Sequence, residues 1–74
     1  MKPLTFLPIS RDAVVRDITG GNGAYQRLSG MGLARGAVVR VVRNDGYGPL
    51  IVALGEGRLI LGRGIAQKVL VEEI

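Results

Sequence analysis

The chain has 74 residues, with ten Lys and Arg against six Asp and Glu, and therefore a formal net charge of +4. This length allows one domain, which we place at residues 1–74. Cys and His are both absent, which excludes disulfides, thiolate metal sites and the commonest general base and metal ligand.

The N-terminal segment, MKPLTFLP, does not resemble a secretion signal. Pro3 and Pro8 interrupt its apolar stretch, and no small-residue cleavage site follows. No part of the chain approaches the roughly 18 uninterrupted apolar residues that a membrane helix needs. We therefore expect a cytoplasmic protein that does not insert into a membrane.

The first predicted strand is residues 13–18, a run rich in branched apolar side chains. Residues 20–23, GGNG, are predicted to break it, because glycine favours turns. A short helix is expected next, since apolar residues then recur at the spacing of one helix face: Ala24, Leu28 and Met31. Gly32 suits the helix end, where a left-handed residue is often required. Gly30 weakens this helix, which must therefore pack its apolar face into the core.

Four further strands are expected, each a short apolar run bounded by glycine-rich turns. They are residues 37–43, 50–54, 58–61 and 68–72. Residues 55–57 are short enough for a hairpin, and residues 62–66 are predicted to form a turn. About five strands in all predict an all-β fold, a small β-barrel with one short helical insertion after the first strand.

Residues alternate between the two faces of a strand, so one set is assigned to the core. That set is Val39, Val41, Leu50, Val52, Leu54, Leu59, Leu61, Val69 and Val71. The opposite set is also apolar and would point outward: Val38, Val42, Ile51, Ile60 and Leu70. A small monomer rarely exposes a large apolar patch. Either these residues are covered or scattered, or they form an interface with a partner or with a second copy of the chain.

No pattern in the chain points to catalysis. The glycine-rich residues 20–23 lack the Gly-Lys-Ser/Thr ending of a phosphate-binding loop. Ser10 and Ser29 have no histidine to activate them. Glu72 and Glu73 would point to opposite faces of the last strand, so they cannot share one cleft. We therefore expect no enzymatic activity.

Nucleic-acid binding is the main alternative, because small barrels commonly bind RNA or DNA and the charge of this chain is favourable. Such sheets usually stack bases on aromatic side chains. Phe6, Tyr25 and Tyr47 lie in three different segments, and none is central to a strand, which disfavours stacking. Binding through phosphate contacts alone stays open, and it would use four arginines: Arg16, Arg40, Arg43 and Arg58.

Several short stretches, taken together, resemble the FeoA family. They are Leu28-x-x-Met31-Gly32-Leu33-x-x-Gly36 at the helix end, Gly48-Pro49-Leu50 at the start of a strand, and Leu59-x-Leu61 followed by Ala66-x-x-Val69-x-Val71. Their order and spacing make the resemblance specific. It runs from about Leu7 to Glu72, which is nearly the whole chain.

The resemblance implies an SH3-like barrel with a helical insertion after the first strand. It also implies a role in ferrous-iron uptake beside FeoB, a membrane permease with a cytoplasmic G-protein domain. The family is further associated with transition-metal binding, but this chain has no Cys or His to offer a metal, so we name no metal ligand and no cofactor. The expected function is that of an accessory protein acting through protein–protein contacts.

The helix end supplies the predicted contact site. The residues expected to anchor the helix and shape its end are Leu28, Met31, Gly32, Leu33 and Gly36. Three others would then face outward beside them: Tyr25, Arg27 and Arg35. Tyr and Arg are enriched where interfaces concentrate their binding energy. We predict that these three residues, together with Tyr47 in the loop at 44–49, contact the partner.

Overall fold

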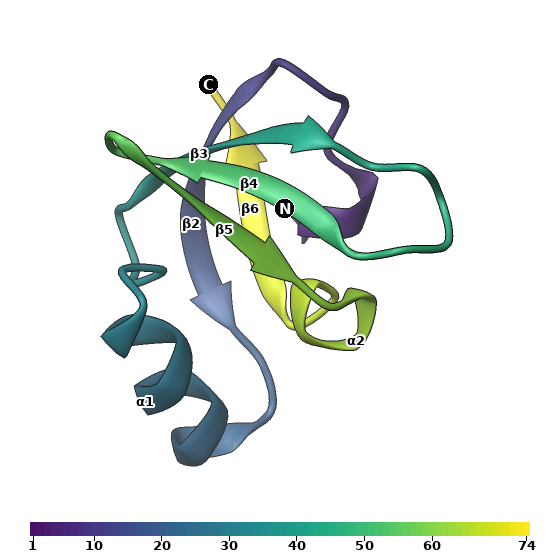
Figure 1. Ribbon diagram of the computed structural model, residues 1–74. Helices are drawn as coiled ribbons and strands as arrows, with labels where there is room; N and C mark the ends of the chain where they lie inside the picture. The colour runs from purple at the N-terminus through teal and green to yellow at the C-terminus, as the bar shows by residue number, and fades with distance from the viewer.

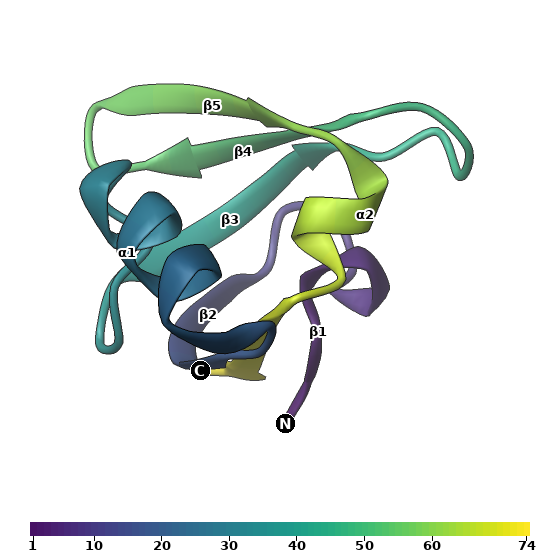
Figure 2. The ribbon, with the colours of Figure 1, turned by 90° about the horizontal axis from the view of Figure 1, so that it is seen from below.

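Six antiparallel β-strands form one sheet in the computed structural model, which describes residues 1–74. In chain order the strands are β1 (Lys2–Pro3), β2 (Asp12–Ile18), β3 (Val38–Arg43), β4 (Leu50–Leu54), β5 (Gly57–Leu61) and β6 (Val69–Glu73). Across the sheet they follow the order β1-β6-β2-β3-β4-β5. The sheet bends back over itself, so that β2 and β6 face β4 and β5 across the interior (Figure 1, Figure 2). The predicted small all-β barrel is confirmed.

The five long strands occupy the predicted segments, and no end differs from its predicted position by more than one residue. The hairpin is confirmed as well, since only Gly55 and Glu56 separate β4 from β5. Gly55 has a φ of 59°, and glycine at the first loop position is what one tight hairpin turn requires. Local patterns locate these strands because short apolar runs end at glycine-rich turns.

The N-terminal segment contains structure that was not predicted. β1 pairs with β6, with Lys2 opposite Val71 and Pro3 opposite Leu70. A single 3₁₀ turn follows, η1 (Leu4–Phe6), and it lies beside α2 (Arg63–Ala66), the helical turn that occupies the predicted turn at 62–66 (Figure 2). A strand of two residues carries no periodicity by which sequence reasoning could find it.

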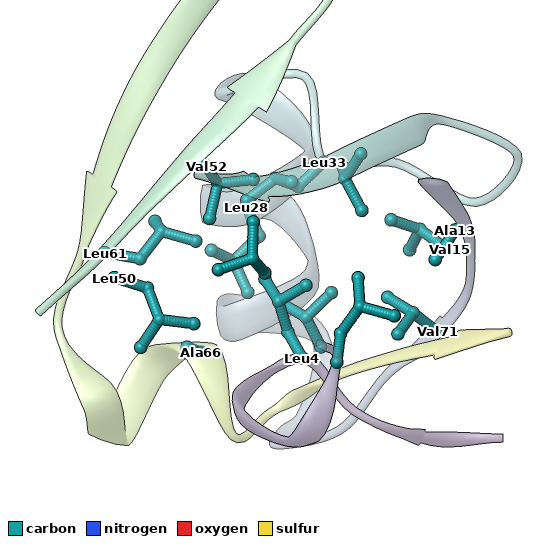
Figure 3. Close-up of a cluster of buried hydrophobic side chains, with 14 of the residues drawn as sticks. Leu4, Ala13, Val15, Leu28, Leu33, Leu50, Val52, Leu61, Ala66 and Val71 are labelled. Atoms are coloured by element: carbon teal, nitrogen blue, oxygen red, sulfur yellow. The ribbon is translucent and has the colours of Figure 1, made fainter. Parts of the chain in front are cut away.

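One cluster of buried apolar side chains fills the space inside the sheet (Figure 3). All nine predicted core residues belong to this cluster or pack against it. Leu54 and Leu59 are the two that stay half-buried, because they lie at the end of β4 and on the edge strand β5. The other buried side chains of the cluster come from the N-terminal segment, β2, the two helices and the segment after α1: Leu4, Leu7, Ala13, Val15, Ile18, Leu28, Leu33 and Ala66.

Helix α1 (Gly21–Gly30) begins earlier than predicted, so the expected break at residues 20–23 is wrong in part. Gly20 precedes the helix with a φ of 100°, and Gly21, the first helix residue, has a φ of 85°, so the chain turns at these two glycines and Asn22 and Gly23 continue into the helix. Glycine disfavours a helix interior by about 1 kcal/mol relative to alanine. Burial of Leu28 and the packing of Tyr25 against the core offset that cost. Tertiary packing therefore stabilises a helix that its glycines disfavour.

The helix end follows the expected pattern at Gly32 but not at Met31. The Gly32 N–H donates to Ser29 O over 2.9 Å, and the Leu33 N–H donates to Leu28 O over 2.9 Å. Those two bonds define the Schellman motif, in which the residue after the left-handed glycine packs against the helix. Leu33 is accordingly fully buried, whereas Met31 is 38% exposed. The prediction that Met31 anchors the core is wrong, because the helix ends at Gly30 and its apolar face does not continue.

The five outward apolar residues do not form one patch. Ile51 lies opposite Ile60 on β4 and β5, whereas Leu70 is opposite Pro3 on the far side of the sheet. Exposed Arg40 separates the two outward valines of β3 from each other. The five residues therefore offer no continuous apolar surface for self-association, which stays a prediction.

Candidate partner-binding site

Tyr25, Arg35 and Asp17 come from three different segments and form a cluster beside α1. The Arg35 guanidinium lies over the Tyr25 ring, with its central carbon 4.9 Å from the ring centroid. Arg35 Nη2 also donates a hydrogen bond to Asp17 Oδ1 over 3.1 Å. Tyr25 is on α1, Arg35 lies between α1 and β3, and Asp17 is on β2. The cluster therefore links the helical insertion to the sheet.

Asp17 holds the cluster in a defined geometry. Its Oδ1 accepts a hydrogen bond from the Ile18 backbone N–H over 2.8 Å in addition to the one from Arg35. Both bonds favour the charged carboxylate and hold the pKa of Asp17 below its ordinary value. The bond from the Ile18 backbone has the largest effect, and the bond from Arg35 comes next. The carboxylate thus lies beside the guanidinium that stacks on the ring.

A shallow depression beside this cluster has a volume of about 310 Å³. Its lining residues are Ile18, Gly21, Asn22, Tyr25 and Arg35. Of these residues, Ile18 belongs to the buried core, whereas Gly21 and Asn22 are exposed. A surface of this kind can receive a side chain of another protein, with an aromatic ring and a cation at its rim.

Arg27 is on the same helix but on a different side of it. Residues two apart on an α-helix point in nearly opposite directions, so Arg27 does not join Tyr25. It lines a second, smaller depression of about 20 Å³ together with Ala24, Leu28, Ile65 and Lys68. Neither Arg27 nor Lys68 takes part in an ion pair. This side of α1 therefore presents uncompensated positive charge.

Tyr47 lies far from the other predicted contact residues. It is 89% exposed in the loop between β3 and β4, and both views place this loop at the opposite side of the molecule from α1 (Figure 1, Figure 2). The structure thus brings Tyr25 and Arg35 together, leaves Arg27 on another flank of α1, and separates Tyr47 from all three.

The loop that carries Tyr47 is held by two residues that sequence reasoning missed. Arg63 donates to Asn44 Oδ1 and to Gly48 O, each over 2.9 Å. Asn44 accepts from the Gly46 N–H over 3.0 Å and donates to the Thr5 carbonyl over 3.1 Å. Asn is a turn former whose side chain can bond the backbone two residues on, as Asn44 does at Gly46, but nothing local indicates that Arg63 would reach this loop.

Gly32 and Gly36 have structural roles at the two bends that follow α1. Their φ angles are 93° and 90°, in the region that favours glycine. A Cβ on Gly32 would lie 2.8 Å from Leu54 Cδ2, so the helix end approaches β4 closely. The Gly36 N–H donates to Val15 O over 2.8 Å. The prediction of a positive φ at Gly32 is confirmed.

Three of the four arginines proposed for phosphate contacts are paired with carboxylates. Arg16 bonds Glu72 over 2.7 Å, Arg40 bonds Asp12 over 2.8 Å, and Arg43 lies 3.3 Å from Asp45. Only Arg58 of the four has no ion pair. The paired arginines offer less positive charge to a phosphate backbone than the sequence suggests.

The chain contains no group of three or more Cys, His, Asp or Glu side chains placed to hold a metal ion. Five of its six acidic residues are in ion pairs, and Glu56 is the exception. None of the helices has the length and apolar character of a membrane span.

Comparison with known proteins places this fold in a family. The FeoA domain model matches residues 2–73. A curated protein of Methanocaldococcus jannaschii, named "Putative Fe(2+) transport protein A", is 38% identical over 73 residues, which cover 99% of this chain and 88% of that protein. These matches span almost every element described above.

Solved structures agree with the assignment. A crystal structure of the iron uptake regulatory protein FeoA superposes with a TM-score of 0.90 at 35% identity, covering 97% of this chain and 96% of the other. Stenotrophomonas maltophilia FeoA in complex with zinc, described as a procaryotic SH3 domain protein, gives a TM-score of 0.78 at 31% identity, covering 97% and 91%. A manganese-dependent transcriptional repressor shares the fold at 19% identity and a TM-score of 0.85, over 99% of this chain and 41% of its own. The chain therefore belongs to the FeoA family, as its resemblance predicted, and it has the family's SH3-like fold.

Proposed function

We propose that this protein is an accessory protein of ferrous-iron transport that acts by binding another protein and catalyses no reaction. The match of the FeoA domain model over residues 2–73 carries this proposal. The M. jannaschii relative is named as an Fe(2+) transport protein, and the S. maltophilia relative was described with the suggestion that it activates ferrous iron transport. The partner is the cytoplasmic G-protein domain of a FeoB-type permease, and the protein acts in the cytoplasm.

The Tyr25–Arg35–Asp17 cluster is the part of the surface best suited to bind that partner. Tyr and Arg give interfaces much of their binding energy. Here the Arg35 side chain is already oriented by the ring beneath it and by Asp17 beside it. A side chain ordered before binding loses less conformational entropy when the complex forms. Arg27, on the other side of α1, and Tyr47, in the distant loop, contact separate parts of the partner.

A pair of matched arginine variants tests this assignment. Arg35→Gln removes the guanidinium from the cluster, and Arg40→Gln removes another exposed arginine, which bonds Asp12 at the opposite end of β2. Each variant loses one exposed ion pair, worth at most about 1 kcal/mol of stability. We expect only Arg35→Gln to weaken binding to full-length FeoB permease in lipid nanodiscs, measured by biolayer interferometry. Equal effects of the two variants would show that the cluster is not the contact.

A salt titration separates this function from nucleic-acid binding. Phosphate contacts release counterions, so the binding constant for duplex DNA falls with a log–log slope of about −0.9 for each contact. We expect binding to the permease to change little between low and high salt compared with that slope. Tight, steeply salt-dependent binding to DNA or RNA, with no binding to the permease, would contradict the proposal.

A further inference from the structure

β5 forms an open edge of the sheet. β4 is its only neighbouring strand, and their register is unbroken over the five residues of β5. In a hairpin with so short a loop, the residues next to the loop exchange both hydrogen bonds, and the bonded pairs then alternate. Gly57, Leu59 and Leu61 therefore bond to β4, whereas the backbone groups of Arg58 and Ile60 point to the open edge. No other backbone or side-chain group of the chain bonds to those two residues.

The two edges of this sheet differ in how they are protected. Proteins usually block edge strands by making them short, by placing proline or bulges in them, or by adding charge. At the other edge, β1 is only two residues long and contains Pro3. β5 is a strand of ordinary length, has no proline or bulge, and carries Arg58 as its one charge. It can therefore accept a further strand.

The side chains along this edge define what an added strand would need. Ile60 is 72% exposed and lies next to Ile51, which is half-buried, on the same face of the sheet. Arg58 is exposed beside Ala53 and has no ion pair. Residues opposite each other on neighbouring strands interact directly. A matching strand would place an apolar side chain beside Ile60 and an acidic one beside Arg58.

We propose that the open edge of β5 binds an extended segment of a partner protein by strand addition, and that this segment carries an apolar and an acidic residue two positions apart. Backbone hydrogen bonds supply affinity in this mode, and alternate side chains supply specificity. The site lies on β5, whereas the cluster proposed above joins α1 to β2 and the segment before β3. It does not depend on whether that cluster binds the permease.

A second copy of the chain fits this edge less well. Antiparallel pairing of two β5 strands about their central Leu59 would set Arg58 of each copy beside Ile60 of the other. This register keeps the two Arg58 side chains from lying opposite each other, where like charges would repel. It gives neither of them a carboxylate partner. An acidic segment of another protein satisfies Arg58 and covers Ile60 at the same time.

Three capped heptapeptides test the backbone part of the proposal. The parent peptide is Ser-Thr-Val-Val-Glu-Thr-Ser, whose first valine and glutamate would face Ile60 and Arg58. One variant is N-methylated at those two residues, and a matched control is N-methylated at the middle valine, whose N–H would point away from β5. We expect the parent and the control to shift the backbone amide signals of residues 57–61 in ¹⁵N NMR spectra of the full chain, and the first variant to shift none. Equal binding of all three, or shifts confined to α1, would overturn the proposal.

A charge exchange tests the acidic residue. Replacing the peptide's glutamate with lysine should weaken binding by more than the roughly two- to five-fold that the loss of one exposed ion pair costs, because like charges on opposite strands repel. In the Arg58→Glu variant the preference should reverse, with the lysine peptide binding more tightly than the glutamate peptide. An unchanged preference would remove Arg58 from the site. If sedimentation shows that the chain alone is a dimer that Ile60→Lys dissociates, a second copy occupies the edge and the proposed occupant is wrong.

Discussion

Gly32 allows a quantitative test of how α1 is joined to the sheet. Its φ of 93° is unfavourable for any residue with a Cβ, and an added Cβ would lie 2.8 Å from Leu54 Cδ2. Residues forced into such backbone regions cost about 1–3 kcal/mol. The Leu54 side chain must also move, and it packs against the core. We therefore expect Gly32→Ala to lower the free energy of unfolding by about 2–3 kcal/mol.

Two other glycines near the end of α1 provide internal controls. Gly36 has a similar φ of 90°, but a Cβ there would meet no atom within 4 Å. Gly36→Ala should therefore report the backbone cost alone, and the difference from Gly32→Ala should report the contact with Leu54. Gly30 lies in the helix with a negative φ and open space around it. Gly30→Ala should stabilise the fold by up to about 1 kcal/mol.

Urea unfolding followed by circular dichroism measures all three variants. Stability changes are compared only between variants with the same m value, the slope of the free energy of unfolding against urea concentration, since a changed m would indicate a change in the unfolded state. In a domain of this size, 1 kcal/mol corresponds to a shift of about 4–8 °C in Tm. The opposite signs expected at Gly30 and Gly32 separate the backbone argument from a general effect of adding a methyl group. The reasoning would be refuted if Gly32→Ala left the free energy of unfolding unchanged, or if Gly30→Ala and Gly32→Ala lowered it equally.

Three further predictions follow from packing, hydrogen bonds and charge. Leu28→Ala should lower the free energy of unfolding by about 2–5 kcal/mol because it empties a buried site. Met31→Ala should lower it by less than about 1 kcal/mol because Met31 is 38% exposed, and urea unfolding of the two variants measures the difference. Arg63→Ala should release the loop that carries Tyr47, so the Gly46 amide should exchange faster with deuterium. The amides of β2 should stay protected, and an unchanged exchange rate at Gly46 would exclude the anchoring role of Arg63. The pKa of Asp17 is depressed in the folded protein. The stability that its ion pair contributes is therefore present above the unfolded pKa of about 3.9 and is lost as pH falls through the lower folded pKa. The difference in urea midpoint between the unmodified protein and Asp17→Asn should be constant near pH 7 and shrink below about pH 4.

The five longer strands and the glycine that follows the helix were accessible to sequence reasoning because their signals are local. Alternating apolar residues between glycine-rich turns located every strand from β2 to β6. The left-handed glycine at position 32 was likewise predictable, since helix ends often need that conformation. Met31 was misassigned for a related reason. Helical spacing identifies a face but not the residue at which the helix stops, and the two hydrogen bonds at Gly32 and Leu33 decide that point.

The candidate binding sites depended on tertiary structure. Tyr25 and Arg35 were both chosen from the sequence, but their stacking and the role of Asp17 follow from the way β2 returns beside α1. The separation of Tyr47 from them had no local signal either. The open edge of β5 exists only because β1, at the opposite end of the strand order, pairs with β6 rather than with β5.

The amino-acid sequence by itself determined the five longer strands of this protein, the left-handed glycine after its helical insertion and the family to which it belongs. Those properties depend on periodicity, glycine positions and short motifs, which are all read within a few residues. Tertiary structure alone decided that Lys2 meets Val71, that Arg63 holds the loop of Tyr47, and that Arg58 and Ile60 face an unpaired edge. Each of those contacts joins residues distant along the chain or depends on strand order, and chain topology, not local pattern, determines which of them form.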